Sequence, residues 1–132
     1  MQNPASSEPN MSPLFILYVE SPLDSAPFYA TLLGSEPLEA QTTFAMFQLE
    51  GGARLGLWSR HTVEPATSHT GPLGGQGELC FRVADVAAVD AMHQTWTARG
   101  LIIVQAPLEM DFGYTFTALD PDGHRLRIYA LI

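Results

Sequence analysis

The sequence contains the same pattern of residues twice. Residues 14–58 and 78–129 each predict a strand, a helix and then three strands, and the two segments align almost residue for residue. Leu14–Val19 corresponds to Glu78–Val83, and Arg54–Trp58 corresponds to Arg125–Tyr129. Each copy has roughly fifty residues, too few to hold a core of its own, so the copies must pack together. The repeat predicts an α+β fold in which two tandem βαβββ modules form a curved mixed sheet around a cleft, where a ligand is expected.

The periodic spacing of apolar residues and the positions of turn residues predict the strands and helices of each copy. The expected strands are 14–20, 36–40, 43–49 and 54–59 in the first copy, and 78–84, 101–105, 114–119 and 125–131 in the second. The first helix is expected to be capped by Asp24 and Ser25 and to stop at Gly34. The second is expected to be capped by Asp85 and to run to about Ala98.

The remaining segments suggest the domain organisation. Residues 1–13 are rich in Pro, Ser and Asn and are expected to form a disordered tail. Residues 14–132 are expected to form one domain, with the first module at 14–59, the second at 77–131 and a linker loop at 60–76. This linker is rich in Gly, Pro, Ser and Thr, and it is interpreted as a lid, a dimer contact or a tether.

Composition excludes some classes of function. The formal net charge is −8, and 6 Lys and Arg residues are too few for a nucleic-acid surface, which depends on such residues to neutralise phosphates. No apolar run approaches the ~20 residues of a membrane span, so no membrane contact is expected. Cys80 is the one cysteine, which rules out an internal disulfide and favours a cytoplasmic location.

Strand alternation divides the side chains of each predicted sheet between two faces. One set is expected to lie under the helices. The other set is expected to face the cleft: Leu14, Ile16, Tyr18, Arg54, Gly56, Trp58, Glu78, Cys80, Arg82, Arg125, Arg127 and Tyr129.

The repeat, together with Phe28-Tyr29, Leu33-Gly34 and the late turn 120–123 (Asp-Pro-Asp-Gly), resembles the vicinal oxygen chelate superfamily. That superfamily includes glyoxalase I, extradiol dioxygenases, fosfomycin-resistance enzymes and bleomycin-binding proteins. Its metal-using members place His, Gln or Glu at four equivalent strand positions. In this sequence those positions carry Leu14, Gly56, Glu78 and Arg127. Glu78 alone could bind a metal, so the resemblance implies no metal centre of the family type and no cofactor.

Within the superfamily, the second copy is most similar to the phenazine antibiotic-resistance proteins. The residues that carry this similarity are Trp58-Ser59, Pro107, Phe112-Gly113, Thr115-Phe116, the turn 120–123 with His124, and Arg127. The resemblance implies a homodimer that holds a planar drug without altering it, and it implies stacking of the drug on Trp58.

The aromatic residues favour a site for a planar ligand, because each stacked pair of rings contributes about 0.5–1.5 kcal/mol to binding beyond the burial of apolar area. Trp58, Tyr18, Phe44, Tyr114, Phe116 and Tyr129 could all project into one concavity, although Phe44, Tyr114 and Phe116 could equally fill the core. Trp96 instead shares a helix face with Val89 and is expected to pack in the core.

These observations predict a cytoplasmic, homodimeric, metal-free protein that sequesters a small planar aromatic antibiotic or metabolite of the phenazine type and thereby confers resistance. The predicted ligand-binding residues are Trp58, Tyr18, Tyr129, Glu78, Arg82, Arg127, Phe116 and Ile16, with no catalytic residue. Glu78 and Arg127 could instead form a purely structural bridge, or Glu78 could act as a general base.

Two alternatives stay open. One is a metal-dependent lyase, dioxygenase or thiol transferase of the same superfamily. The other is a ligand sensor or a subunit that binds a protein partner through the 60–76 loop.

Overall fold

The computed structural model describes residues 12–67, 70–75 and 77–132. The chain divides into two compact units, Met1–Ser68 and His69–Ile132, which we call the first half and the second half. Most of the predicted tail lies outside the described residues, as do positions 68, 69 and 76 of the predicted linker. Residues 60–63 turn back directly after a strand, where the Val63 amide donates to the Ser59 carbonyl at 3.1 Å and the Val63 side chain is buried.

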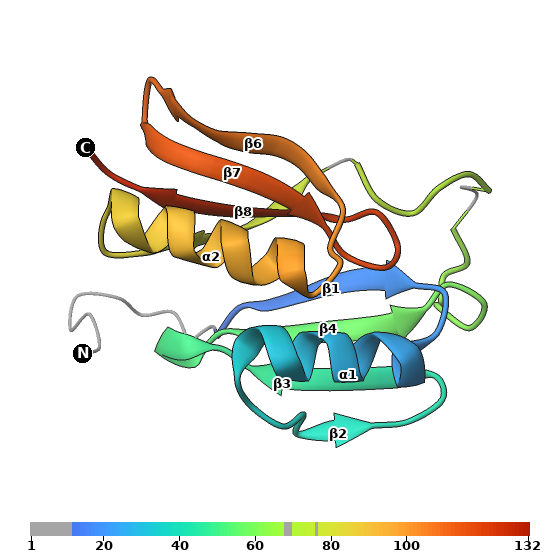
Figure 1. Ribbon diagram of the computed structural model, residues 1–132. Coiled ribbons are helices and arrows are strands. Elements are labelled where there is room, and N and C mark those ends of the chain that lie inside the picture. The colour runs from blue at the N-terminus through green and yellow to red at the C-terminus, as the bar shows by residue number, and fades with distance from the viewer. Residues whose placement is uncertain (1–11, 68–69, 76) are drawn as a thin grey trace, which may run out of the picture. The chain divides into compact units, whose positions relative to one another are not determined.

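The first half is a βαβββ module, as predicted (Figure 1). Its elements are β1 (Leu14–Val19), α1 (Pro22–Leu33), β2 (Glu39–Ala40), β3 (Phe44–Gln48), a 3₁₀ turn at Glu50–Gly52, and β4 (Arg54–Ser59). The sheet order is β1-β4-β3-β2, with β1 parallel to β4 and the other pairs antiparallel.

The second half repeats this topology. Its elements are β5 (Glu78–Arg82), α2 (Val86–Ala98), β6 (Ile103–Met110), β7 (Gly113–Leu119) and β8 (Arg125–Ala130). The order is β5-β8-β7-β6, with β5 parallel to β8 and the other pairs antiparallel. The predicted α+β class and the tandem βαβββ arrangement are therefore confirmed.

The ends of the helices follow from local chemistry. Asp85 caps α2 by accepting from the Ala88 amide at 2.8 Å, as predicted. Gly34 ends α1 at φ 69°, a left-handed conformation that glycine adopts without steric cost. The predicted start of α1 is wrong: Ser21 is the N-cap, and α1 begins at Pro22, because proline needs no hydrogen-bond acceptor in the first turn.

Two strands differ from their predicted bounds by more than two residues at one end. The predicted strand 36–40 is reduced to Glu39–Ala40, and the predicted strand 101–105 extends through Pro107 to Met110. Proline is tolerated there because β6 is an edge strand whose register with β7 shifts between Gln105 and Leu108.

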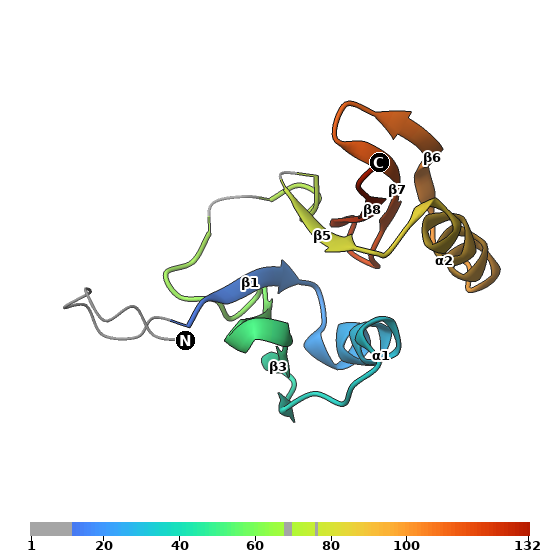
Figure 2. The same cartoon turned by 90° about the vertical axis from the view of Figure 1, so that its left-hand side faces the viewer.

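Each helix covers one face of its own sheet, as Figure 2 shows end-on for α2. In the first half the buried residues include Val19, Tyr29, Phe47, Leu55 and Leu57. In the second half Trp96 of α2 is 2% exposed, and its ring packs edge-on against Phe116 with centroids 5.4 Å apart. The predicted core position of Trp96 is thus confirmed.

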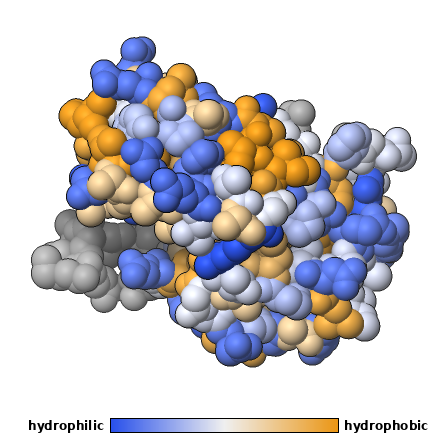
Figure 3. Space-filling view, in the orientation of Figure 1, coloured by the Kyte–Doolittle hydropathy of each residue, from blue (hydrophilic) through white to orange (hydrophobic). Residues whose placement is uncertain are grey.

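Apolar surface remains on both halves (Figure 3). The exposed large apolar residues include Leu14, Phe15, Ile16 and Tyr18 on β1, and Val104, Leu108 and Met110 on β6. No helix in the described part of the chain is both long enough and apolar enough to cross a membrane.

Candidate functional site

The face of the second sheet that lies opposite α2 carries an ion pair and a cavity. In the parallel pair β5–β8, Glu78 lies opposite Arg125, and Cys80 lies opposite Arg127. Arg127 therefore reaches diagonally to Glu78: its Nε donates to Oε1 at 2.7 Å, and its Nη2 donates to Oε2 at 3.2 Å. The side chains are 14% and 28% exposed, respectively, so solvent screens this bidentate pair only partly.

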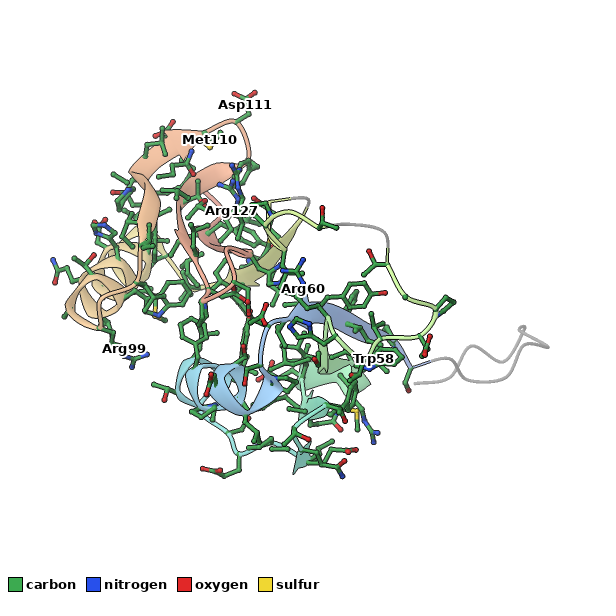
Figure 4. The ribbon with its side chains drawn as sticks, turned by 90° about the vertical axis from the view of Figure 1, so that its right-hand side faces the viewer. Trp58, Arg60, Arg99, Met110, Asp111 and Arg127 are labelled. Atoms are coloured by element: carbon green, nitrogen blue, oxygen red, sulfur yellow. The ribbon has the colours of Figure 1, made fainter. Side chains whose placement is uncertain are left out.

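Strands β6 and β7 supply further partners for Arg127. Its Nη1 donates to Oε1 of Gln105 at 3.0 Å and to Oγ1 of Thr115 at 3.3 Å. Thr115 in turn donates to the Ile128 carbonyl at 2.7 Å, and Thr117 donates to the same oxygen of Gln105 at 3.1 Å. The guanidinium, labelled in Figure 4 on the second half, is therefore held in one orientation by a connected network of polar groups.

The cavity beside this network has a volume of about 330 Å³ and is lined by Glu78, Cys80, Phe112, Arg127 and Tyr129. Phe112 and Tyr129 contact each other edge-on with centroids 6.2 Å apart, and the guanidinium of Arg127 lies 5.7 Å from the centroid of Phe112. Aromatic walls beside an anchored charge pair suit a planar aromatic molecule with a few polar atoms.

The charges in the cavity are fixed at neutral pH. The hydrogen bond from Arg127 lowers the pKa of Glu78 below its ordinary value of 4.5, and Glu78 raises the pKa of Arg127. Glu78 is therefore ionised and unsuited to act as a general base. Partial burial, together with the Glu78 carboxylate 3.5 Å away, raises the pKa of the Cys80 thiol, which disfavours the reactive thiolate.

The first half carries a separate aromatic surface. Tyr18 lies opposite Trp58 in the β1–β4 pair, and Ile16 lies opposite Gly56, so these side chains share a face as predicted. Phe44 lies opposite Trp58 on β3 and contacts it edge-on at 6.2 Å. Figure 4 labels Trp58 on this half of the chain.

The sequence-predicted site residues are thus distributed unequally. Glu78, Arg127 and Tyr129 meet at the cavity in the second half, whereas Ile16, Tyr18 and Trp58 form the surface of the first half. Arg82 lies opposite Tyr129 but does not line the cavity.

Phe116 is placed differently from the prediction. It is fully buried and contacts Trp96 and His93 of α2, so it belongs to the core beneath the helix rather than to the face that carries the cavity. Tyr114 shares its side of β7 and donates to Asp90 of α2 at 2.8 Å. The face of β7 on the side of the cavity is instead formed by Thr115 and Thr117, which lie opposite Tyr129 and Arg127.

The residues of the site that were not assigned from the sequence include Phe112 and Gln105. Phe112 was noted only as part of a motif, and it lines the cavity from the turn between β6 and β7. Gln105 was assigned only to a strand, although it holds both Arg127 and Thr117. The sequence signal for each residue was its position along the chain. Phe112 directly precedes Gly113, and Gln105 lies on the strand that pairs with β7.

The four positions at which the resemblance implies metal ligands do not fit a divalent ion. Leu14 offers no donor atom, and a side chain at Gly56 would place its Cβ 2.8 Å from Cζ of Phe44. In the second half Arg127 is a cation, and it binds both carboxylate oxygens of Glu78. A divalent ion needs several converging nitrogen, oxygen or sulfur ligands, which this set does not provide.

The fold and these motifs agree with the comparisons with known proteins. Residues 13–128 match the Glyoxalase/Bleomycin resistance protein/Dioxygenase superfamily, and the chain belongs to this superfamily. Among curated proteins it is 29% identical over 127 residues to the phenazine antibiotic resistance protein EhpR of Enterobacter agglomerans, covering 93% of this chain and 95% of that protein.

Solved structures show the same fold. Protein ATC0852 of Agrobacterium tumefaciens is 52% identical, with a TM-score of 0.82 over 93% of this chain and 98% of that one. A glyoxalase-related enzyme of Fulvimarina pelagi is 20% identical, with a TM-score of 0.77 over 91% of this chain and 87% of that one, and this likeness concerns the fold alone.

Proposed function

We propose that the protein binds and sequesters a planar aromatic antibiotic or metabolite of the phenazine type, without a metal and without altering the ligand. The observation that carries this proposal is the cavity of the second half, in which Phe112 and Tyr129 form aromatic walls beside the Glu78–Arg127 pair. The similarity to a phenazine antibiotic resistance protein along 93% of the chain supports the choice of ligand class.

The size of the cavity supports a small ligand. A volume of about 330 Å³ lies at the lower end of the range for small-molecule sites, which is roughly 300–1,000 Å³. Burying one face of a tricyclic ring system against Phe112 and Tyr129 removes apolar area from water and adds edge or stacking contacts. The pair of charges then orients the polar substituents of the ligand.

Binding without reaction is favoured by the chemistry of the same residues. Glu78 is held ionised by Arg127, which makes it a weak base, and the pKa of the Cys80 thiol is raised. Of the four family metal positions, only Glu78 offers a donor atom for an ion, and Arg127 binds both of its carboxylate oxygens. The alternative of a metal-dependent enzyme therefore has no observation in its favour at this cavity.

A calorimetric titration of EDTA-treated protein with phenazine tests the proposal. We expect saturable binding with one ligand per chain, and recovery of chemically unchanged ligand by chromatography and mass spectrometry. Phe112→Ala should weaken binding about tenfold, since it removes one aromatic wall whose exposed ring contributes little to folding. Phe15→Ala is the matched control, because this exposed ring lies on the opposite face of β1 from Ile16 and Tyr18. No saturable binding up to millimolar ligand, or conversion of the ligand, would contradict the proposal.

The homodimer and the cytoplasmic location stay predictions. Sedimentation velocity at micromolar concentration tests the first, since a dimer has twice the 14.4 kDa mass of the chain. Fractionation of the source cells tests the second.

A further inference from the structure

The hydrogen-bond donors of Arg127 are almost fully used by the protein itself. A guanidinium has five N–H groups. Among the described residues, Glu78 accepts two of them, Gln105 accepts one and Thr115 accepts one. One N–H of Nη2 is left for a ligand in the cavity.

This arrangement determines which ligand group Arg127 could receive. A carboxylate pairs best with a guanidinium through two parallel N–H groups. The edge formed by Nε and Nη2 is taken by Glu78, and both N–H groups of Nη1 are taken by Gln105 and Thr115. A ligand carboxylate would therefore receive a single hydrogen bond.

The Glu78 carboxylate opposes an anion further. It lines the cavity beside Arg127, and its Oε1 also accepts from the Cys80 thiol at 3.5 Å. An anionic ligand at the remaining N–H would lie close to this second carboxylate, in a setting that is only partly screened by water. The positive charge of Arg127 is thus already balanced before a ligand arrives.

We propose that this cavity selects planar aromatic ligands whose polar group is an uncharged hydrogen-bond acceptor, such as a carboxamide or a ring nitrogen, over the corresponding carboxylates. The proposal rests on the proposed function, since it names the class of ligand within the same site. An uncharged acceptor satisfies the one available N–H and creates no repulsion with Glu78. Specificity then comes from a repulsive element built into the site, with Glu78 as the residue that determines it.

Wild-type protein provides the first test, by calorimetry at pH 7.5 with three probes: phenazine, phenazine-1-carboxamide and phenazine-1-carboxylate. We expect the carboxamide to bind at least about tenfold more tightly than the carboxylate, with unsubstituted phenazine also binding. Carboxylate affinity equal to or greater than carboxamide affinity would overturn this inference and leave the proposed function standing. Failure of all three probes to bind would overturn the proposed function, and this inference with it.

A variant locates the origin of the preference. Glu78→Gln keeps the shape of the side chain but removes its charge, so the ratio of carboxamide to carboxylate affinity should fall by about tenfold. Glu50→Gln is the matched control, because it removes one charge at an exposed turn of the first half and should leave the ratio as in wild type. An unchanged ratio in Glu78→Gln would show that the Glu78 charge does not determine the preference, and an equal fall in Glu50→Gln would show that overall charge determines it. Either result would overturn the assignment to Glu78.

Discussion

Oε1 of Glu78 and Nε of Arg127 lie 2.7 Å apart, although 49 positions separate the two residues in the sequence. The parallel pairing of β5 and β8 brings them together, because Glu78 lies opposite Arg125 and Arg127 is the next residue on the same face. The corresponding positions of the first half, Leu14 and Gly56, carry no charge. The two modules thus share a fold but differ in chemistry, and the polar part of the candidate site belongs to the second.

Replacing Arg127 by Lys tests whether the geometry of the guanidinium matters beyond its charge. A lysine cannot donate in the same fork to Glu78 and also reach Gln105 and Thr115. We expect Arg127→Lys to lower the free energy of unfolding by about 1–2 kcal/mol and to weaken phenazine binding about tenfold. Urea denaturation and calorimetry measure the two effects. Wild-type values for both would show that one positive charge at this position is sufficient.

The Glu78–Arg127 pair predicts a pH dependence of stability. Because the pKa of Glu78 is lower in the folded protein than its ordinary value of 4.5, the pair stabilises the fold fully above about pH 4.5. This contribution is lost as the pH falls from that value through the lower folded pKa. Urea denaturation of wild type and Glu78→Gln between pH 7 and pH 3 measures it.

The difference in stability between the two proteins should be largest at pH 7 and should shrink below pH 4.5. The pKa of Glu20 is also lowered, chiefly by its hydrogen bond with His61, but this exposed group is present in both proteins and cancels in the difference. A difference that does not vary with pH would mean that the carboxylate gains nothing from Arg127.

The ring of Phe44 lies so close to Gly56 that we predict a loss of stability when any side chain is added at position 56. A Cβ at this position would lie 2.8 Å from Cζ and 3.1 Å from Cε1 of Phe44, so Gly56→Ala must displace the ring. We expect a loss of about 1–2 kcal/mol in the free energy of unfolding and a change in the fluorescence of Trp58, which contacts Phe44 edge-on.

The double variant Gly56→Ala/Phe44→Leu makes room for the added methyl group and should cost less than the two single changes added together. Strictly additive losses would show that the two side chains do not compete for the same space.

Much of the fold follows from the sequence, since each copy of the repeat contains apolar strands, a capped helix and glycine turns in the same order. The N-cap of α2 and the end of α1 were predicted correctly, because a single residue determines each of these helix ends: Asp85 for α2 and Gly34 for α1. The start of α1 was mispredicted because Asp24 and Ser21 are both capping residues, and Pro22 decides between them by fitting the first turn. The length of β6 was underestimated because Pro107 normally interrupts a strand, and only the edge position of β6 explains its presence.

The candidate site was predicted less completely. The alternation of side chains along each strand correctly placed Glu78, Arg127 and Tyr129 on one face of the sheet. This works because β5 and β8 pair in register, so the two-residue period continues from one strand to the next. Phe116 was assigned to the ligand face, since its aromatic character suits both a core and a ligand site. The pairing of β7 with β8 decides the question, by placing Phe116 opposite the buried Ile128. Gln105 could not be found from its own neighbours because its role depends on contacts with two other strands.

The stacking role of Trp58 stays a prediction that fluorescence can test. Phenazine should quench the emission of wild type in a saturable manner, and Trp58→Phe should lose most of that quenching and about tenfold in affinity. Trp96→Phe is the matched control, because Trp96 is buried against Phe116 and its removal should leave the quenching of Trp58 in place. Equal quenching in wild type and Trp58→Phe would place the ligand away from this residue.

The most direct test of the account is a ¹⁵N–¹H correlation spectrum of EDTA-treated protein recorded during a titration with phenazine. The account predicts that the amide resonances of the residues lining the cavity, Glu78, Cys80, Phe112, Arg127 and Tyr129, shift progressively and saturate at one equivalent of ligand. Resonances of the α2 residues that face away from the cavity should move little. Absence of any saturable shift, or shifts confined to residues outside the cavity, would contradict the claim that this cavity holds a planar aromatic ligand.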